Sequence, residues 1–404
     1  MSWKEISSLA RRLRFVKLAL KAPRGMSHLC WVFRISRKTG YKWVARFERE
    51  GLRGLRHRPR RPHHCPRQIS AEWLARIRRL RRRHRSWGSK KLRVRLCKEH
   101  PAQRVPSVRS ITKWLRRMKL SRRRYYRPAG PHVKRPSLTQ ARRCNQVWTV
   151  DFKGWFRTAD GQRAEPLTVR DMFSCYLLTV HVLADQSWPA VQRVCAGLFR
   201  QNGYPEAIRV DNGMPFGSIG PAGLSRLSAW WTALGIRVEF IAPGHPEQNP
   251  AHEQMHRVLK AEATRPASSN RRAQQRRIGR WVRIYNHIRP HEALDMRTPA
   301  ERYQPSGAAA RVVTLRYPQA WLVRRVRSNG EIRWRGRKRF IGEAFVGYPV
   351  GLKPTAKEVW RVYFRDVLLG ELWDLDPGGM RPVRRARGFC KALKDISARM
   401  KPTV

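Results

Sequence analysis

The chain has 404 residues, which is enough for two to four domains with a sizeable core. It contains 88 Lys and Arg residues but only 27 Asp and Glu residues, which gives a formal net charge of +61. We therefore expect a polyanionic partner such as nucleic acid. No stretch reaches the roughly 18 apolar residues of a membrane span, and the N-terminus lacks a signal-peptide core, so the sequence excludes a membrane protein and predicts a cytoplasmic one.

The positive charge is concentrated at the N-terminal end. Residues 1–143 hold 45 basic and 5 acidic side chains, whereas residues 144–306 hold 21 and 14. The strongest contact with a polyanion is therefore expected in the first third of the chain. The seven cysteines are scattered and include no CxxC pair, which favours reduced thiols over a disulfide framework or a structural zinc site.

Residues 1–60 predict a helix-turn-helix domain. Leu9, Leu13, Val16 and Leu20 recur at helical spacing, and Ser36 is a good N-cap for a helix that runs to Glu50. Basic residues share one side of this second helix, as a recognition helix in a major groove requires: Arg37, Lys38, Lys42, Arg46 and Arg49. The alternative is a basic, solvated helix in an ordinary bundle.

Residues 69–120 predict a second helix-turn-helix module. Ser70 and Ser107 are N-cap candidates for its first and last helices. The last helix leaves four basic residues on the side opposite its apolar face: Arg109, Lys113, Arg116 and Arg117. Basic, Pro-containing linkers at 61–68 and 121–143 flank the module, and either lie along a DNA backbone or act as plain linkers.

Residues 144–306 predict a central α/β domain with a mixed sheet and flanking helices, the order found in ribonuclease-H-like nucleases and phosphoryl transferases. Strands are expected at 147–156, 165–169, 175–183, 207–211 and 237–241, and helices at 188–202, 224–234 and from about 250 onward.

Three acids on separate elements of this domain form a candidate catalytic site. Asp151 lies inside an apolar strand, Asp211 ends a strand before a Gly turn, and Glu253 falls in the first turn of a helix whose dipole favours its charge. If they converge, they can hold two Mg²⁺ or Mn²⁺ ions for phosphodiester cleavage. Taken singly, each acid has a simpler explanation: an ion pair for Asp151, a turn cap for Asp211 and a solvated helical charge for Glu253.

Four motifs in order resemble bacterial insertion-sequence transposases with a retroviral-integrase-type DDE core: 148–154 (WTVDFKG), 210–216 (VDNGMPF), 246–260 (PEQNPAHEQMHRVLK) and 285–294 (YNHIRPHEAL). The resemblance implies a DNA transposase of a mobile element, with Asp151, Asp211 and Glu253 as its metal-binding triad. It also implies double-stranded DNA partners (the element's terminal repeats and a target), a homodimer or larger assembly, and a place at the bacterial nucleoid. His256 and Lys260 are candidates for contact with the substrate phosphate, although an ordinary surface histidine is the alternative for His256.

The sequence departs from this pattern around the third acid. Pro250 and Gln254 replace the usual Gly and Arg, and Glu247 stands at the family's nominal spacing from Asp211. We prefer Glu253, because His256 and Lys260 follow it at the family's intervals, and keep Glu247 as the alternative. The rival function is a catalytically inactive DNA-binding repressor or structural factor derived from a transposase.

Residues 307–376 predict short strands in a small SH3-like β-barrel, which resembles the C-terminal domain of integrases. Strands are expected at 323–326, 332–334, 339–341, 350–352, 360–364 and 367–372, with a hairpin turn at Ser328-Asn329-Gly330 between the first two. Residues 377–404 are predicted to form a basic tail.

Overall fold

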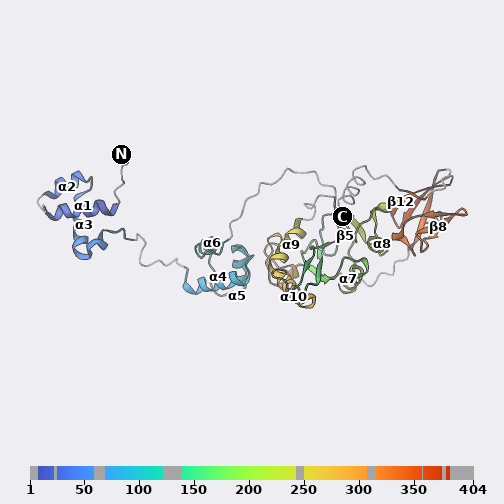
Figure 1. Cartoon of the computed structure of the whole chain (residues 1–404), viewed down its shortest axis with the longest axis horizontal. Coiled ribbons are helices and arrows are strands. Elements are labelled where there is room, and N and C mark those ends of the chain that lie inside the picture. Colours follow the sequence, from blue (N-terminus) through green and yellow to red (C-terminus); the bar gives the residue numbers. More distant parts are fainter. Residues whose placement is uncertain are drawn as a thin grey trace. The chain divides into compact units, whose positions relative to one another are not determined.

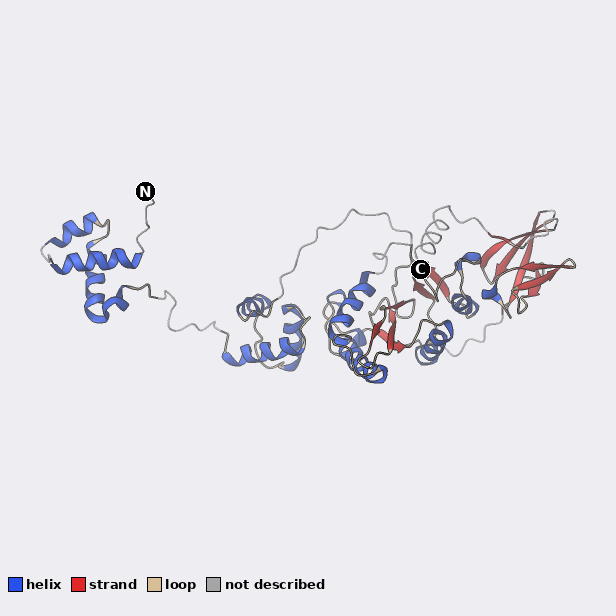
Figure 2. Cartoon of the chain, viewed as in Figure 1, coloured by secondary structure: helices blue, strands red, loops and turns tan. Residues whose placement is uncertain are grey.

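The computed structural model describes residues 8–21, 25–58, 69–121, 138–242, 250–306, 315–356, 358–374 and 379–382. The chain separates into two compact units, residues 1–68 and 69–404. Figure 1 locates the elements along the chain, and Figure 2 shows that the first two groups of elements are helical while strands occur only in the later parts.

The first unit contains the expected helix-turn-helix. Its helices are α1 (Ser8–Lys21), α2 (Met26–Val32) and α3 (Arg37–Glu50), followed by the 3-10 helix η2 (Gly51–Leu55). Ser36 caps α3 as expected, since its side chain accepts the Thr39 N–H at 3.2 Å. Gly40 lets α3 approach α1 and α2 closely, because a Cβ there would lie 2.6 Å from Cys30 Sγ and 3.0 Å from the Phe15 ring.

The expected helix is present as α1, and only part of its regular apolar set is buried. Phe15, Val16 and Ala19 are its buried residues, whereas Leu9 and Leu20 are 36% and 46% exposed. Helical spacing predicts the helix but does not decide which of two neighbouring sides packs against the rest of the domain.

The second helical module begins the second unit. It consists of α4 (Ala71–Arg83), α5 (Ser89–Glu99) and α6 (Val108–Arg117), and its core includes Ile77, Leu92, Ile111 and Leu115. Ser70 and Ser107 accept backbone N–H groups at the starts of α4 and α6, which confirms both caps.

A mixed sheet forms the centre of residues 144–306. Its main strands run in the order β4 (Leu177–Leu183), β3 (Arg163–Asp171), β1 (Val147–Phe152), β5 (Ala207–Val210) and β6 (Arg237–Phe240), and the short β2 (Phe156–Arg157) also pairs with β3. The pairs among β4, β3 and β1 are antiparallel, whereas β1, β5 and β6 run parallel. This confirms the expected mixed sheet.

Helices cover both faces of this sheet. Trp148 and Val150 of β1 pack in one core with α7 (Trp188–Asn202) and α8 (Arg226–Ala233). Helices α9 (Pro250–Ala263) and α10 (Arg271–His287) form a second core with Leu177 and Val180 of β4. Because side chains alternate along a strand, Thr149 and Asp151 lie on the α9 side of β1.

Two side-chain amides of α10 bind the backbone of β4. The Asn286 amide accepts the Leu177 N–H at 3.0 Å and donates to the Leu177 carbonyl at 2.9 Å. The Gln275 amide does the same farther along β4: it accepts the Val182 N–H at 2.7 Å and donates to the Val180 carbonyl at 3.0 Å. These four bonds fix α10 along the outer side of β4.

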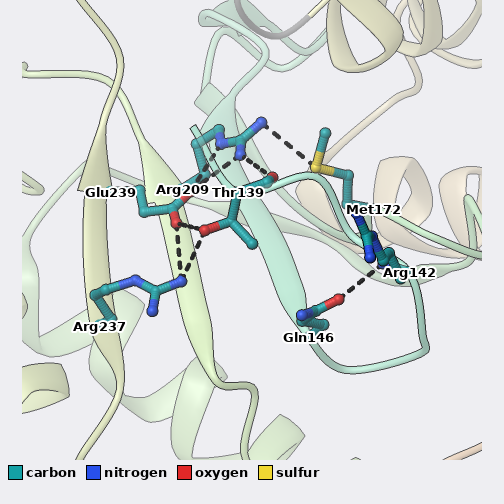
Figure 3. Close-up of polar contacts among 7 residues, drawn as sticks. All are labelled: Thr139, Arg142, Gln146, Met172, Arg209, Arg237 and Glu239. Carbon is teal, nitrogen blue, oxygen red and sulfur yellow. Dashed lines mark hydrogen bonds and ion pairs between the residues drawn. The ribbon is translucent and has the colours of Figure 1, made fainter. Parts of the chain in front are cut away.

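A buried ion pair ties the segment before β1 to the sheet (Figure 3). The Arg209 guanidinium on β5 binds Glu239 Oε2 on β6 at 3.0 Å and donates to the Thr139 carbonyl at 2.6 Å. The Thr139 hydroxyl donates to Glu239 Oε1 at 2.5 Å. Although burial opposes ionisation, Thr139 and Arg209 hold the pKa of Glu239 below its ordinary value.

The C-terminal strands form antiparallel sheets, but the described strands do not close into the expected SH3-like barrel. One sheet has the order β13 (Arg381–Pro382), β12 (Val367–Trp373), β11 (Val359–Phe364), β10 (Pro349–Ala356) and β7 (Leu322–Arg325), and the other pairs β8 (Glu331–Trp334) with β9 (Arg337–Phe340). The tight turn at 327–331 exists, with Gly330 at φ +80, yet the strands flanking it join different sheets.

Several sequence-based expectations fall outside the described residues. These are the linker at 61–68, most of the linker at 121–143, Glu247, and nearly all of the tail at 377–404. In the part of the chain that is described, no helix is both long and apolar enough to cross a membrane.

The buried ion pair gives a stability test. Glu239→Gln leaves the Arg209 charge buried without its partner, so we expect a loss of unfolding free energy on the order of 3 kcal/mol. Glu206→Gln is the matched control, because it breaks an exposed ion pair with Arg143 and should cost less than about 1 kcal/mol. Urea denaturation followed by tryptophan fluorescence measures both, and equal losses would contradict a structural role for the Arg209–Glu239 pair.

Candidate active site

Strand pairing brings two of the three predicted acids to neighbouring positions. β1 and β5 are parallel, with Thr149 opposite Arg209. Two residues further along each strand stand Asp151 and Asp211, and adjacent strands lie roughly 4.8 Å apart. Asp211 directly follows β5, and Asp151 is the fifth residue of β1, so both acids lie near the C-terminal ends of their strands.

Asp151 is the most perturbed of the three acids. Burial, followed by the negative charge of Asp211, raises its pKa to about 7, and the charge of Glu253 adds to the rise. Its side chain is 32% exposed, and among the described residues no Lys or Arg forms a salt bridge with it. Among the described residues the ion-pair explanation for Asp151 therefore has no Lys or Arg partner, and the charges of Asp211 and Glu253 both act on Asp151.

Asp211 sits at the Gly turn that the sequence indicates. Its Oδ1 accepts the Gly213 N–H at 3.2 Å, and the Gly213 backbone approaches the carboxylate closely. Although Asp211 is open to solvent on one side, desolvation by its surroundings raises its pKa, and the Gly213 N–H opposes the rise. Asp211 therefore caps this turn, and it also lies beside Asp151.

Glu253 lies in the first turn of α9, as expected, and its side chain is exposed. Its negative charge contributes to the raised pKa of Asp151. The described residues give no position for the alternative, Glu247. Pro250 is the first residue of α9, where a proline costs no hydrogen bond.

Lys153 follows Asp151 by two residues, and Lys260 of α9 lies near Lys153. Burial lowers the pKa of Lys153, the charge of Lys260 lowers it further, and Asp151 opposes the shift. The two ammonium groups therefore repel each other near Asp151. A pair of cations beside a group of carboxylates can hold an anionic substrate, and phosphate is such an anion.

A buried network of threonines and histidines lies behind Asp151. The Thr168 hydroxyl donates to the Asp151 carbonyl at 2.8 Å and contacts Nε2 of both His252 and His256, at 2.6 and 2.8 Å. His252 Nδ1 lies 2.8 Å from the Thr149 hydroxyl. Burial lowers the pKa of His256 to about 3 and that of His252 well below its ordinary value, so both are neutral at pH 7.

Sequence reasoning missed this network. His252 and His256 stand one helical turn apart, so a search for histidines on one side of α9 would have found the pair. Thr168 could be found only from the β1–β3 register, in which it lies opposite Asp151. His256 is buried, and this leaves little of its ring open to a substrate phosphate.

The basic side chains predicted to bind DNA lie at the surfaces of their modules. On α3, four are exposed, and Arg46 is half-buried with its guanidinium 5.3 Å from the centre of the Trp43 ring. On α6 all four are exposed: Arg109, Lys113, Arg116 and Arg117. Each set is therefore available to a ligand on its own module.

Models of known families match along most of the chain. A helix-turn-helix domain matches residues 11–63, and a homeodomain-like domain matches residues 39–115. Two integrase core domain models match residues 141–246 and 234–299, and the C-terminal domain of the IS481 family transposases matches residues 322–376.

Related proteins come from bacterial insertion elements. The insertion element IS476 uncharacterized 39.2 kDa protein of Xanthomonas euvesicatoria is 30% identical over 250 residues, which cover 61% of this chain and 67% of the relative. The insertion element IS407 uncharacterized 31.7 kDa protein of Burkholderia multivorans is 31% identical over 183 residues, which cover 45% of this chain and 64% of the relative.

The solved structures that align with the chain include viral integrases. The HTLV-2 integrase catalytic core domain in complex with magnesium covers 41% of this chain and all of its own, at 14% identity and a TM-score of 0.30. A simian T-cell lymphotropic virus intasome in complex with PP2A regulatory subunit B56 gamma covers 72% of this chain and 97% of its own, at 14% identity and a TM-score of 0.35.

The family assignment rests on the ordered domain matches and on the relative from Xanthomonas, not on the distant integrase structures. Helix-turn-helix domains, an integrase core and an IS481-type C-terminal domain follow one another in the order that the sequence motifs indicate. The chain belongs to the bacterial insertion-sequence transposases with a retroviral-integrase-type core.

Proposed function

We propose that the chain is an active, metal-dependent DNA transposase that cleaves phosphodiester bonds at the element's ends and joins those ends to target DNA. The single observation that carries this proposal is the position of Asp151 and Asp211 at the C-terminal ends of the adjacent parallel strands β1 and β5, where the charge of Asp211 raises the pKa of Asp151. Mutual repulsion of this kind destabilises a protein unless a cation offsets it, and hard carboxylate oxygens are the ligands that Mg²⁺ and Mn²⁺ prefer.

The donor set fits divalent cations, and we assign Asp151, Asp211 and Glu253 as the residues that hold two of them. When bound, such ions supply Lewis-acid stabilisation of the phosphoryl oxygens and a lower pKa for the attacking water or hydroxyl. Asp151 must be ionised for this role, and its raised pKa means that its proton leaves as the site fills.

In the first step a water oxygen forms a bond to phosphorus, the bond from phosphorus to the 3′ oxygen breaks, and the 3′ oxygen leaves as a hydroxyl. In the second step that 3′-hydroxyl loses its proton and attacks a phosphodiester of the target strand, releasing a new 3′-hydroxyl there. Lys153 and Lys260 hold the phosphate against the carboxylates. Both steps are displacements at phosphorus and need no redox cofactor.

The helical modules hold the DNA. Exposed basic residues of α3 and α6 contact the terminal repeats, and two modules in one chain specify a longer site than one. Because two ends of the element must be joined together, the active form is a dimer or a larger assembly. Phosphate contacts of this kind make binding fall steeply with salt.

The acids give the direct test of catalysis. Asp151→Asn, Asp211→Asn and Glu253→Gln should each reduce cleavage of labelled DNA carrying the inverted repeats that flank the coding region by at least about 100-fold with Mg²⁺ or Mn²⁺. Asp160→Asn is the matched control, since Asp160 caps a turn through Gln162 N–H and should leave cleavage unchanged.

Two further measurements separate the alternatives. Glu247→Gln tests the other candidate for the third acid. If Glu247→Gln abolishes cleavage while Glu253→Gln remains fully active, Glu247 is the third metal-binding acid. DNA binding by fluorescence anisotropy should survive every one of these substitutions. Wild-type protein that binds the repeats tightly but never cleaves them would instead support the repressor or structural factor.

The raised pKa of Asp151 predicts how metal binding depends on pH. A proton on Asp151 competes with the cation, so the apparent Mg²⁺ affinity should rise about tenfold per pH unit up to pH 7 and level off above it. Isothermal titration calorimetry between pH 5.5 and 8.5 measures the slope. Asp151→Asn should remove it, and an affinity that does not change between pH 5.5 and 7 would contradict the assignment of Asp151.

A further inference from the structure

His252 and His256 of α9 flank Glu253 and point at the strand that carries Asp151. His252 is fully buried, and both histidines contact one hydroxyl, that of Thr168. Potential metal-binding atoms of Asp151, His252 and His256 all lie within 4.8 Å of one another. The hydrogen bonds of the two imidazoles decide which nitrogen is free to bind a ligand.

The Thr168 hydroxyl fixes which nitrogen of each imidazole carries the proton. A hydroxyl has one hydrogen and two lone pairs, and Thr168 gives its hydrogen to the Asp151 carbonyl. It can therefore only accept from His252 and His256, so each ring donates from Nε2. A neutral imidazole has a single N–H, so Nδ1 of each ring carries a lone pair and no proton.

The two Nδ1 atoms face different surroundings. Nδ1 of His252 lies 2.8 Å from the Thr149 hydroxyl, whereas the other acceptor of that hydroxyl, the Arg170 carbonyl, lies at 3.4 Å. The shorter contact takes the Thr149 hydrogen, so both nitrogens of the His252 ring are hydrogen-bonded. Nδ1 of His256 lies 3.7 Å from Asp151 Oδ2, beyond hydrogen-bond range. A nitrogen lone pair and a carboxylate oxygen thus face each other, and a cation between them would satisfy both.

We propose that His256 Nδ1 is an additional ligand of the cation held by Asp151, so that this transposase binds one metal through mixed oxygen and nitrogen ligands. Two ligand atoms each about 2.1 Å from one ion lie about 3 to 4 Å apart, and 3.7 Å falls in this range. The inference rests on the proposed function, since Asp151 must hold the metal. His252 and Thr168 are positioning residues, because they orient the His256 ring without reaching the ion.

A nitrogen ligand changes the metal preference of the site. Imidazole binds transition-metal ions more strongly than Mg²⁺, whereas an all-carboxylate site gives less discrimination. His256→Gln should therefore weaken Mn²⁺ binding by about 10- to 100-fold and Mg²⁺ binding by less. The ratio of the two affinities is a readout that a purely structural histidine would not change.

Pulsed electron paramagnetic resonance on the full chain loaded with one equivalent of Mn²⁺ tests the proposal directly. A bound imidazole gives ¹⁴N modulation of the electron spin echo, and we expect this modulation in the wild-type protein. His256→Gln should abolish it, and Thr168→Val should weaken it by releasing the ring. His181→Gln is the matched control, because this exposed histidine lies on β4, outside the network, and its loss should leave the modulation intact.

The outcomes separate this inference from the proposed function. If Mn²⁺ binds and Asp151→Asn removes it, but the folded wild-type protein shows no ¹⁴N modulation, the histidine ligand is wrong and the carboxylate site stands. If Asp151→Asn leaves Mn²⁺ binding unchanged, both are wrong. Modulation that persists in His256→Gln protein with a wild-type circular dichroism spectrum also overturns the assignment of His256.

Discussion

The repulsion of Asp151 by two other carboxylates is the constraint on which the core is organised. Asp151, Asp211 and Glu253 lie far apart in the sequence, and the ionised form of Asp151 would gain free energy if the other two acids moved away from it in the absence of a cation. The fold prevents this by fixing their backbones. Parallel pairing holds β1 beside β5, and the contacts of Thr149 and Thr168 with the two histidines hold α9 against β1.

The same sheet serves two different purposes on its two faces. On one face, Trp148 and Val150 pack into the largest apolar core of the domain. On the other face, polar groups replace apolar ones between β1 and the start of α9, and most of them are hydrogen-bonded to one another. A buried polar layer is costly unless every donor finds an acceptor, so its presence next to Asp151 points to selection for the site and not for stability.

The positions of Asp151, Asp211 and Glu253 on their elements could be predicted from the sequence because each depends on local pattern. An apolar run, a Gly turn and a helix start are all visible within a few residues. The roles of Thr168 and His252 could not be predicted, because they depend on the β1–β3 register and on how α9 is rotated. The C-terminal domain shows the same limit: its strands were predicted from alternation, but the pairing of β7 with β10 joins residues that no local pattern links.

The amides of Asn286 and Gln275 have a consequence for how copies of the protein can meet. β4 pairs only with β3 among the described strands, so its other side would present open backbone groups to any passing strand. The two side chains of α10 occupy the groups of Leu177, Val180 and Val182 instead. These bonds block growth of the sheet into a second molecule along the β4 edge, so two copies of the chain cannot join through this edge.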